Sequence, residues 1–317
     1  MTSLLDKDLT ACKELLLQSL EHTDNPILTR VLELVKMRTG KMMRPQMVLL
    51  SARLFGPVTP DILSVAVAFE ALHTASLIHD DVVDESDERR GHESINHAQT
   101  NRVAILCGDY ILGEALQLIA SIGNLQIVQL MSKASKALAE GELLQLHTIQ
   151  SADLSEATYF RIITDKTAAL FAACAASGAT LAGASPTNID TLYRFALLVG
   201  QCFQIKDDIL DYVGGDIGKP KGNDLKEGKI TLPLLYALRG HEQEMAPYVQ
   251  KIKQGLVAPD EIGQLIEFTE QQGGTRYATS KMNEIADQAR QLLTRYEDSP
   301  VKTALMEYID YVIQRKY

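Results

Sequence analysis

Apolar residues recur every three or four positions along most of the chain, which is the spacing that predicts amphipathic α-helices. Clear runs are Leu16–Leu20, Ile62–Val65–Phe69–Leu72, Leu112–Leu116–Ile119 and Leu138–Leu143–Leu146. The alternation of apolar and polar residues that indicates a half-buried β-strand is hard to find. The pattern therefore predicts an all-α protein.

Proline marks where these helices end. None of the ten prolines lies between Val65 and Ser185, so proline breaks no helix in that part of the chain. We expect irregular segments at Phe55–Pro60, Gly91–Thr100, Gly183–Asn188 and, longest of all, Gly214–Gly228. Since no segment has the composition of a linker or of a short repeat, residues 1–317 are expected to form a single domain.

Composition narrows the choice of ligand. Of the 317 residues, 46% are apolar and 23% are charged, and the net charge is −10. This charge argues against a nucleic-acid partner, and an anionic ligand would need metal cations or a local basic cluster.

The four cysteines form no C-x-x-C pair and are interpreted as reduced core thiols of a cytoplasmic protein. The opening MTSLLDKDLT has acidic residues where a signal peptide is basic.

One uncharged stretch, Thr167–Ile189, is long enough to span a bilayer. It is rich in Ala, Gly, Ser and Thr rather than in Leu and Ile. Small residues of this kind let neighbouring helices approach closely. We therefore interpret the stretch as a buried helix and expect no membrane-spanning segment.

Two acidic segments, Asp80–Asp84 and Asp207–Asp211, share the pattern D-D-x-x-D. The first and last aspartates of each are four residues apart, so they lie on one face of a helix and repel each other. A divalent cation with a preference for oxygen ligands, such as Mg²⁺, would relieve that repulsion. The alternative is that each segment is a solvated acidic helix end. Neither has the glycine and terminal glutamate of an EF-hand calcium loop.

Basic residues accompany the first acidic segment. Arg89 and Arg90 follow it, and Lys41 and Arg44 lie upstream, at a chain turn. Arginine binds phosphate oxygens in a bidentate manner. Each pair alone could be ordinary surface charge, but together with the aspartates the basic residues indicate a site for two anionic groups.

These motifs occur in the order found in the trans-isoprenyl diphosphate synthases, or polyprenyl synthetases, and nearly the whole chain resembles that family. The matching segments are Gly40-Lys41-x-x-Arg44-Pro45, His73 to Asp84, Arg89-Arg90-Gly91, Gly108-Asp109-Tyr110, Ala139-Glu140-Gly141-Glu142, Lys166-Thr167, Phe203-Gln204-x-x-Asp207-Asp208-x-x-Asp211 and Gly218 to Pro233. The overall likeness is closest to octaprenyl-type, long-chain members. The resemblance implies an all-α helical bundle around a central cavity.

The resemblance also implies a role for each matched residue. The Mg²⁺ ligands would be Asp80, Asp84 and Asp207, with Asp81, Asp208 and Asp211 as supporting or alternate ligands of about three ions. Isopentenyl diphosphate would contact Lys41, Arg44, His73 and Arg90. The allylic diphosphate would contact Arg89, Lys166, Thr167, Gln204, Lys219 and Lys229, with Lys166 also counted among the catalytic residues. His79 receives no role.

The implied reaction is a head-to-tail condensation. Metal ions and cations would stabilise the departing diphosphate, and the isopentenyl double bond would attack the allylic carbon. The departing diphosphate would then accept the proton.

The product chain would run down a tunnel lined by Phe69, Leu72, Ala75, Ser76, Ile119 and Met131. Ala75 and Ser76 are small where short-chain members have an aromatic ring. Phe69 lies about 16 Å below Asp80 at the helical rise, so we expect a long all-trans product of about C35 to C45. Small residues here could also serve helix packing alone.

Three other functions remain open. The first is a short-chain synthase that makes farnesyl or geranylgeranyl diphosphate. The second is a class I terpene cyclase, which has no second substrate and usually replaces the second D-D-x-x-D. The third is a non-catalytic subunit, although such subunits tend to lose the aspartates. By the same resemblance, the protein would be a homodimer.

Overall fold

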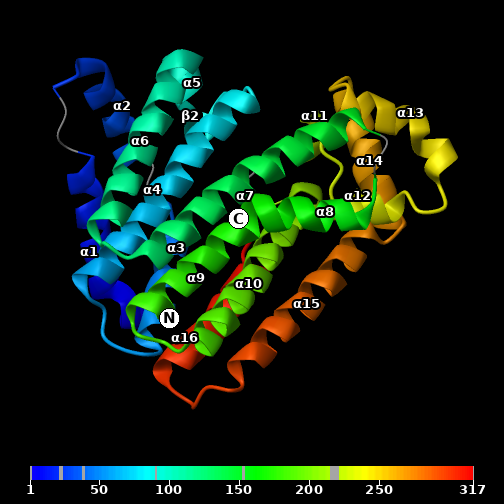
Figure 1. The fold of residues 1–317 in the computed structure, drawn as a ribbon. Helices are drawn as coiled ribbons and strands as arrows, with labels where there is room; N and C mark the ends of the chain where they lie inside the picture. The colour runs from blue at the N-terminus through cyan, green and yellow to red at the C-terminus, as the bar shows by residue number, and fades with distance from the viewer. Residues whose placement is uncertain are drawn as a thin grey trace. The chain divides into compact units, whose positions relative to one another are not determined.

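The computed structural model describes residues 2–20, 24–37, 40–89, 91–151, 154–214 and 221–316 (Figure 1). The long helices are α1 (Thr2–Ser19), α2 (Pro26–Lys36), α3 (Met43–Arg53), α4 (Pro60–Val83), α6 (Asn101–Ser121), α7 (Leu125–Gln150), α8 (Glu156–Ile163), α9 (Ala169–Leu181), α10 (Pro186–Val213), α13 (Glu242–Lys253), α14 (Pro259–Gln271), α15 (Gly274–Leu293) and α16 (Pro300–Gln314). Short elements are α5 (Ile95–Ala98), α11 (Asn223–Lys226), α12 (Leu232–Ala237) and one π-helical turn, η1 (Thr164–Ala168). The predicted all-α class is confirmed.

Strand structure in the described residues is limited to one two-residue pair. β1 (Glu88–Arg89) and β2 (His92–Glu93) pair antiparallel directly after α4. Gly91, between them, has a φ of 76°, which favours glycine. This pair lies partly inside the segment that the sequence predicts to be irregular.

Capping explains where the central helices begin. The Thr59 side chain accepts a hydrogen bond from the N–H of Ile62 at the start of α4, and Thr100 does the same for Val103 in α6. Proline is a weaker guide than expected, because Pro247 lies inside α13. Gly123, with a φ of 68°, lies in the turn after α6, where no proline is present.

The described chain divides into two compact units. The first comprises Met1–Ser135, Ala173–Tyr193 and Ser299–Val301, and the second comprises Lys136–Ala172, Arg194–Asp298 and Lys302–Tyr317. In the first unit, Phe69 on α4 is among the largest fully buried side chains. In the second, residues of α12, α13 and α14 pack around Tyr212. The single domain inferred from the sequence remains a prediction.

The uncharged stretch Thr167–Ile189 is divided among the end of η1, α9 and the start of α10. Residues 168–177, in η1 and α9, are buried throughout, which confirms the predicted buried helix for this part. Two other helices, α4 and α6, are long and apolar enough to span a membrane by length and composition alone. Most of the apolar window of α4 is buried, whereas only 33% of that of α6 is.

Candidate functional site

The first acidic segment covers the last residues of α4 and its C-cap residue, Asp84. Asp80 and Asp84 are half-buried, whereas Asp81 is only 4% exposed. Arg89 from β1 donates from Nε to Oδ1 of Asp81 over 2.6 Å, and the two side chains form an ion pair. The arginine predicted to contact the allylic diphosphate is therefore already bound to the middle aspartate. Glu85, with a φ of 49°, follows the helix in a left-handed conformation that is uncommon outside glycine.

The second non-glycine residue with positive φ among the described residues is Met42, at 55°. It is buried and precedes α3, between the predicted substrate ligands Lys41 and Arg44. The Gln46 amide donates to the Lys41 carbonyl over 2.7 Å and closes this turn. Non-glycine residues in left-handed conformations cluster at functional sites, and both examples here adjoin predicted site segments.

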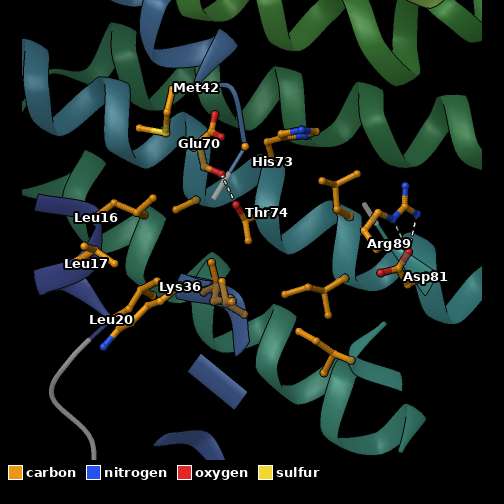
Figure 2. Close-up of a pocket in the computed structure, with 17 residues that line it drawn as sticks. Leu16, Leu17, Leu20, Lys36, Met42, Glu70, His73, Thr74, Asp81 and Arg89 are labelled. Atoms are coloured by element: carbon orange, nitrogen blue, oxygen red, sulfur yellow. Dashed lines mark hydrogen bonds and ion pairs between the residues drawn. The ribbon is translucent and has the colours of Figure 1, made fainter. Parts of the chain in front are cut away.

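A largely apolar cavity lies in the first unit, beside these two segments (Figure 2). Figure 2 shows Asp81 and Arg89 on one side of it, and Leu16, Leu17 and Leu20 of α1 on the other. Its lining also includes His73, Glu70 and Thr74 of α4, together with Gly40 and Met42. Of the predicted isopentenyl diphosphate ligands, His73 lines the cavity, and Lys41 lies between two residues that do.

The predicted tunnel residues do not line this cavity. Five of them are buried: Phe69, Leu72, Ala75, Ile119 and Met131. Ser76 is half-buried, and its hydroxyl donates to the His73 carbonyl over 2.9 Å. The six residues thus belong to α4, α6 and α7 of the first unit, where they contribute mainly to its apolar interior.

His79, which received no role from the sequence, packs directly against α6. Its Nε2 lies 3.1 Å from the Ile105 carbonyl and 3.4 Å from a carboxylate oxygen of Asp109. A Cβ added to Gly108 would lie 2.3 Å from that nitrogen. The Gly108-Asp109 motif therefore makes room for His79 and gives it a charged partner.

In the second unit, η1 carries the predicted ligands Lys166 and Thr167. Two glycines allow it to approach its neighbours, because a Cβ at Gly141 of α7 would lie 2.6 Å from the Lys166 nitrogen, and one at Gly200 of α10 would lie 2.5 Å from Cα of Ala168. Lys166 forms an ion pair with Glu142 of α7. π-Helical turns are rare and often occur at functional sites.

A chain of hydrogen bonds joins η1 to the second acidic segment. The Thr167 hydroxyl donates to Oε1 of Gln204 over 2.9 Å, and Nε2 of Gln204 donates to Asp208 over 2.9 Å. The Tyr159 hydroxyl donates to the other Asp208 oxygen over 2.5 Å. Burial raises the pKa of Asp208 to about 7, although both hydrogen bonds act in the opposite direction. A nearby cation would reduce that cost of burying charge.

Asp207 has a different environment from Asp208. Its side chain is 43% exposed, and Oδ1 lies 2.7 Å from Nη2 of Arg315 at the end of α16. The Arg315 guanidinium also lies 3.8 Å from the centre of the Phe203 ring and donates to the Phe203 carbonyl. A cation thus already faces the aspartate that the sequence analysis assigns to Mg²⁺.

The chemistry of the aspartates in each unit fits Mg²⁺. Asp80 and Asp84 in the first unit, and Asp207 in the second, are half-buried carboxylates, the ligand type that Mg²⁺ prefers. Within the described residues, no group of three or more His, Cys, Asp or Glu side chains is arranged to hold a metal alone. Mg²⁺ commonly takes one or two carboxylates and completes its shell with water and substrate phosphates.

Two predicted ligands, Arg90 and Lys219, lie outside the described residues. Three contributors were missed by sequence reasoning: Tyr159, Arg315 and Glu142. Glu142 is one of the two glutamates of the Ala139–Glu142 motif and could have been singled out with Glu140. Nothing in the local sequence points to Tyr159 or Arg315. Tyr159 is 49 residues from its partner Asp208, and Arg315 is still further along the chain from Asp207.

Comparisons with known proteins agree with this arrangement of motifs. The family model of polyprenyl synthetases matches residues 25–268. The chain belongs to the polyprenyl synthetase family. It is 38% identical to the octaprenyl diphosphate synthase of Escherichia coli, over 87% of this chain and 86% of that protein. The resemblance stated from the motifs is thereby confirmed, as is the enzyme class of polyprenyl diphosphate synthase.

Solved structures of this family superpose closely on the chain. The decaprenyl diphosphate synthase of Rhodobacter capsulatus has a TM-score of 0.93 and 33% identity, with 100% of this chain and 98% of that one covered. A geranylgeranyl pyrophosphate synthase of Bacteroides thetaiotaomicron has a TM-score of 0.86 and 40% identity, with 99% and 98% covered. Both long-chain and short-chain synthases therefore share this fold.

Proposed function

We propose that this protein condenses isopentenyl diphosphate with an allylic diphosphate, head to tail, in a Mg²⁺-assisted reaction. The observation that carries the proposal is the site in the second unit. Thr167 and Gln204, both predicted to contact the allylic diphosphate, are hydrogen-bonded to each other, and Gln204 is hydrogen-bonded to Asp208. Lys166 lies in the same π-helical turn as Thr167, and Asp207 is next to Asp208.

The cations of this site suit a diphosphate that gains charge as it departs. Lys166 would leave its ion pair with Glu142 and bind the diphosphate oxygens. The Thr167 hydroxyl would fix the orientation of the diphosphate. Mg²⁺ held by Asp80, Asp84 and Asp207 would stabilise the same developing charge. The reaction would also require apolar walls that exclude water from the allylic carbon.

The second substrate would bind in the first unit. The turn that carries Lys41 and Arg44 is closed by Gln46, and His73 lies at the wall of the apolar cavity. An anionic headgroup with a short apolar tail matches this combination of cations and apolar surface. Lys41→Ala should therefore raise KM for isopentenyl diphosphate more than KM for the allylic primer. An increase in the primer KM alone would mean that the two sites are exchanged.

The test of the reaction is turnover with isopentenyl diphosphate, an allylic primer and Mg²⁺. Asp80→Ala and Asp207→Ala should each lower turnover at least ~100-fold, the scale of removing one preorganised electrostatic group. Either variant with near-wild-type turnover would contradict the proposed metal site. A wild-type enzyme that consumed the primer without isopentenyl diphosphate would be a cyclase instead.

For the product, we propose a long all-trans chain of about C35 to C45, with the chain growing beside α4 past Ala75 and Ser76 towards Phe69, Ile119 and Met131. Small side chains at Ala75 and Ser76 support this choice, as do relatives named as octaprenyl and decaprenyl synthases. The geranylgeranyl pyrophosphate synthase at 40% identity favours a shorter product as the second candidate. Chromatography of the product decides between them. Ala75→Phe should shorten a long product while ionisation of the primer is retained.

We further propose a homodimer formed through α6. Its apolar residues Ile105, Leu106 and Leu116 are 43%, 67% and 52% exposed. Exposed apolar side chains of this size are typical of an interface between proteins. An isologous contact between two copies would bury them.

A further inference from the structure

Asp211, the last aspartate of the second motif, is bound to a neighbouring stretch of backbone. Its Oδ1 accepts a hydrogen bond from the N–H of Asn223 over 2.9 Å, and its Oδ2 accepts one from Asp224 over 3.2 Å. Its main-chain carbonyl accepts a third bond, from Gly222, over 3.0 Å. One residue of α10 thus binds three consecutive N–H groups.

These bonds replace a missing helix cap. Gly222 precedes the short helix α11 and has no side chain to bind the first N–H groups. The Asp211 carboxylate supplies from another helix what an aspartate or asparagine at the N-cap position normally supplies. The opposite side of the backbone is also fixed, because a Cβ at Gly222 would lie 2.3 Å from Cγ2 of Ile262. The segment is therefore held between α10 and α14.

The fixed segment carries Lys229, one of the predicted diphosphate ligands. The Lys229 N–H donates to the Asp224 carbonyl over 2.7 Å, and Gly228, with a φ of 79°, makes the turn before it. The Lys229 ammonium lies 2.6 Å from Glu227 in the same segment. The main-chain position of Lys229 is thus connected to Asp211 through a single intermediate residue, Asp224.

Asp207 and Asp211 differ in what their carboxylates contact. The two are four residues apart on α10, and this spacing alone predicts a shared metal-binding face. In the structure, the Asp207 carboxylate is 43% exposed and contacts a side-chain cation, whereas both Asp211 oxygens accept backbone N–H groups. We infer that Asp211 is a positioning residue, which fixes residues 221–229 and with them Lys229, and that it is not a Mg²⁺ ligand. This inference rests on the proposed function for the role of Lys229.

Asparagine separates the two roles of Asp211. An asparagine has one side-chain oxygen, so it can accept one of the two N–H bonds that the Asp211 carboxylate accepts, and its neutral amide is a poor Mg²⁺ ligand. Asp211→Asn should therefore lower turnover by less than Asp211→Ala, which should lose at least about tenfold. The matched control, Asp207→Asn, should lose at least ~100-fold.

Amide hydrogen exchange gives a readout that does not require turnover. In Asp211→Ala, exchange of the peptide that contains residues 222–229 should be faster by about tenfold. In Asp211→Asn the exchange rate should lie between those of Asp211→Ala and wild type, and in Asp207→Asn it should resemble wild type. This result would stand even if the wild-type enzyme failed to condense the proposed substrates, so the two proposals fail separately. Unchanged exchange in Asp211→Ala would overturn the positioning role. An Asp211→Asn variant as inactive as Asp207→Asn, but with slower exchange than Asp211→Ala, would make Asp211 a metal ligand.

A double-mutant cycle tests the connection to Lys229. If Asp211 acts by placing Lys229, the effects of Asp211→Ala and Lys229→Ala on KM for the allylic substrate should overlap, and the double variant should be little worse than Lys229→Ala. Fully multiplicative effects would show that the two residues act independently.

Discussion

Among single residues, neighbours in one motif differ because an α-helix turns about 100° per residue. Asp207 meets Arg315, Asp208 meets Tyr159 and Gln204, and Asp211 meets backbone N–H groups. The sequence predicts which aspartates share a helix face, because that depends on local spacing alone. Their partners depend on segments far away along the chain, so Arg315 and Tyr159 could not be predicted.

The four cysteines give a residue-scale prediction. All are buried and unpaired with one another, and burial raises the pKa of Cys12, Cys107 and Cys202 to about 12 and that of Cys174 as well. Only the thiolate reacts with thiol reagents, so the folded protein should show almost no labelling at pH 8. The protein in denaturant should show four reactive thiols. Rapid labelling of a native thiol would show that its helix opens locally.

Between elements, glycine determines how closely helices pack. Sequence reasoning treats an isolated glycine inside a helix as a weakness, because glycine is a poor helix former. At Gly108, Gly141 and Gly200 the missing side chain is instead what lets a ring or a backbone approach. The helices α4 and α6 were predictable from their apolar spacing. The π-helical turn η1 was not, because it depends on close packing against α7 and α10, which local sequence spacing does not show.

A pair of glycine substitutions tests whether glycine allows these helices to pack closely. Gly141→Ala should destabilise the fold by about 1–3 kcal/mol, because its Cβ would lie 2.6 Å from the backbone of Lys166. Gly113→Ala on α6 meets no atom within 4 Å and should stabilise the fold by up to about 1 kcal/mol. Denaturant unfolding measures both. Equal effects of the two substitutions would contradict the close approach of η1 to α7.

For the whole molecule, the exposed face of α6 leads to a prediction about assembly. If α6 forms the proposed dimer interface, Leu106→Glu combined with Leu116→Glu should place charges in it and shift the protein to monomers, as measured by analytical ultracentrifugation. Leu256→Glu is the matched control, because Leu256 is also 67% exposed but belongs to the second unit. A variant of α6 that sediments like wild type would locate the interface elsewhere or show that the protein is monomeric.

The two sides of α4 restrict how this protein can change over evolutionary time. Asp81 faces the apolar cavity, while Asp80 and Asp84 lie on a neighbouring side of the same rod. Deleting one residue between Ala75 and Asp80 would rotate every aspartate of the motif by about 100° relative to the preceding part of the helix and turn Asp81 away from the cavity. Replacing a side chain leaves the direction of each residue around the helix axis unchanged. New product lengths should therefore arise along α4 by exchange of residues, and insertions or deletions there should be eliminated by selection.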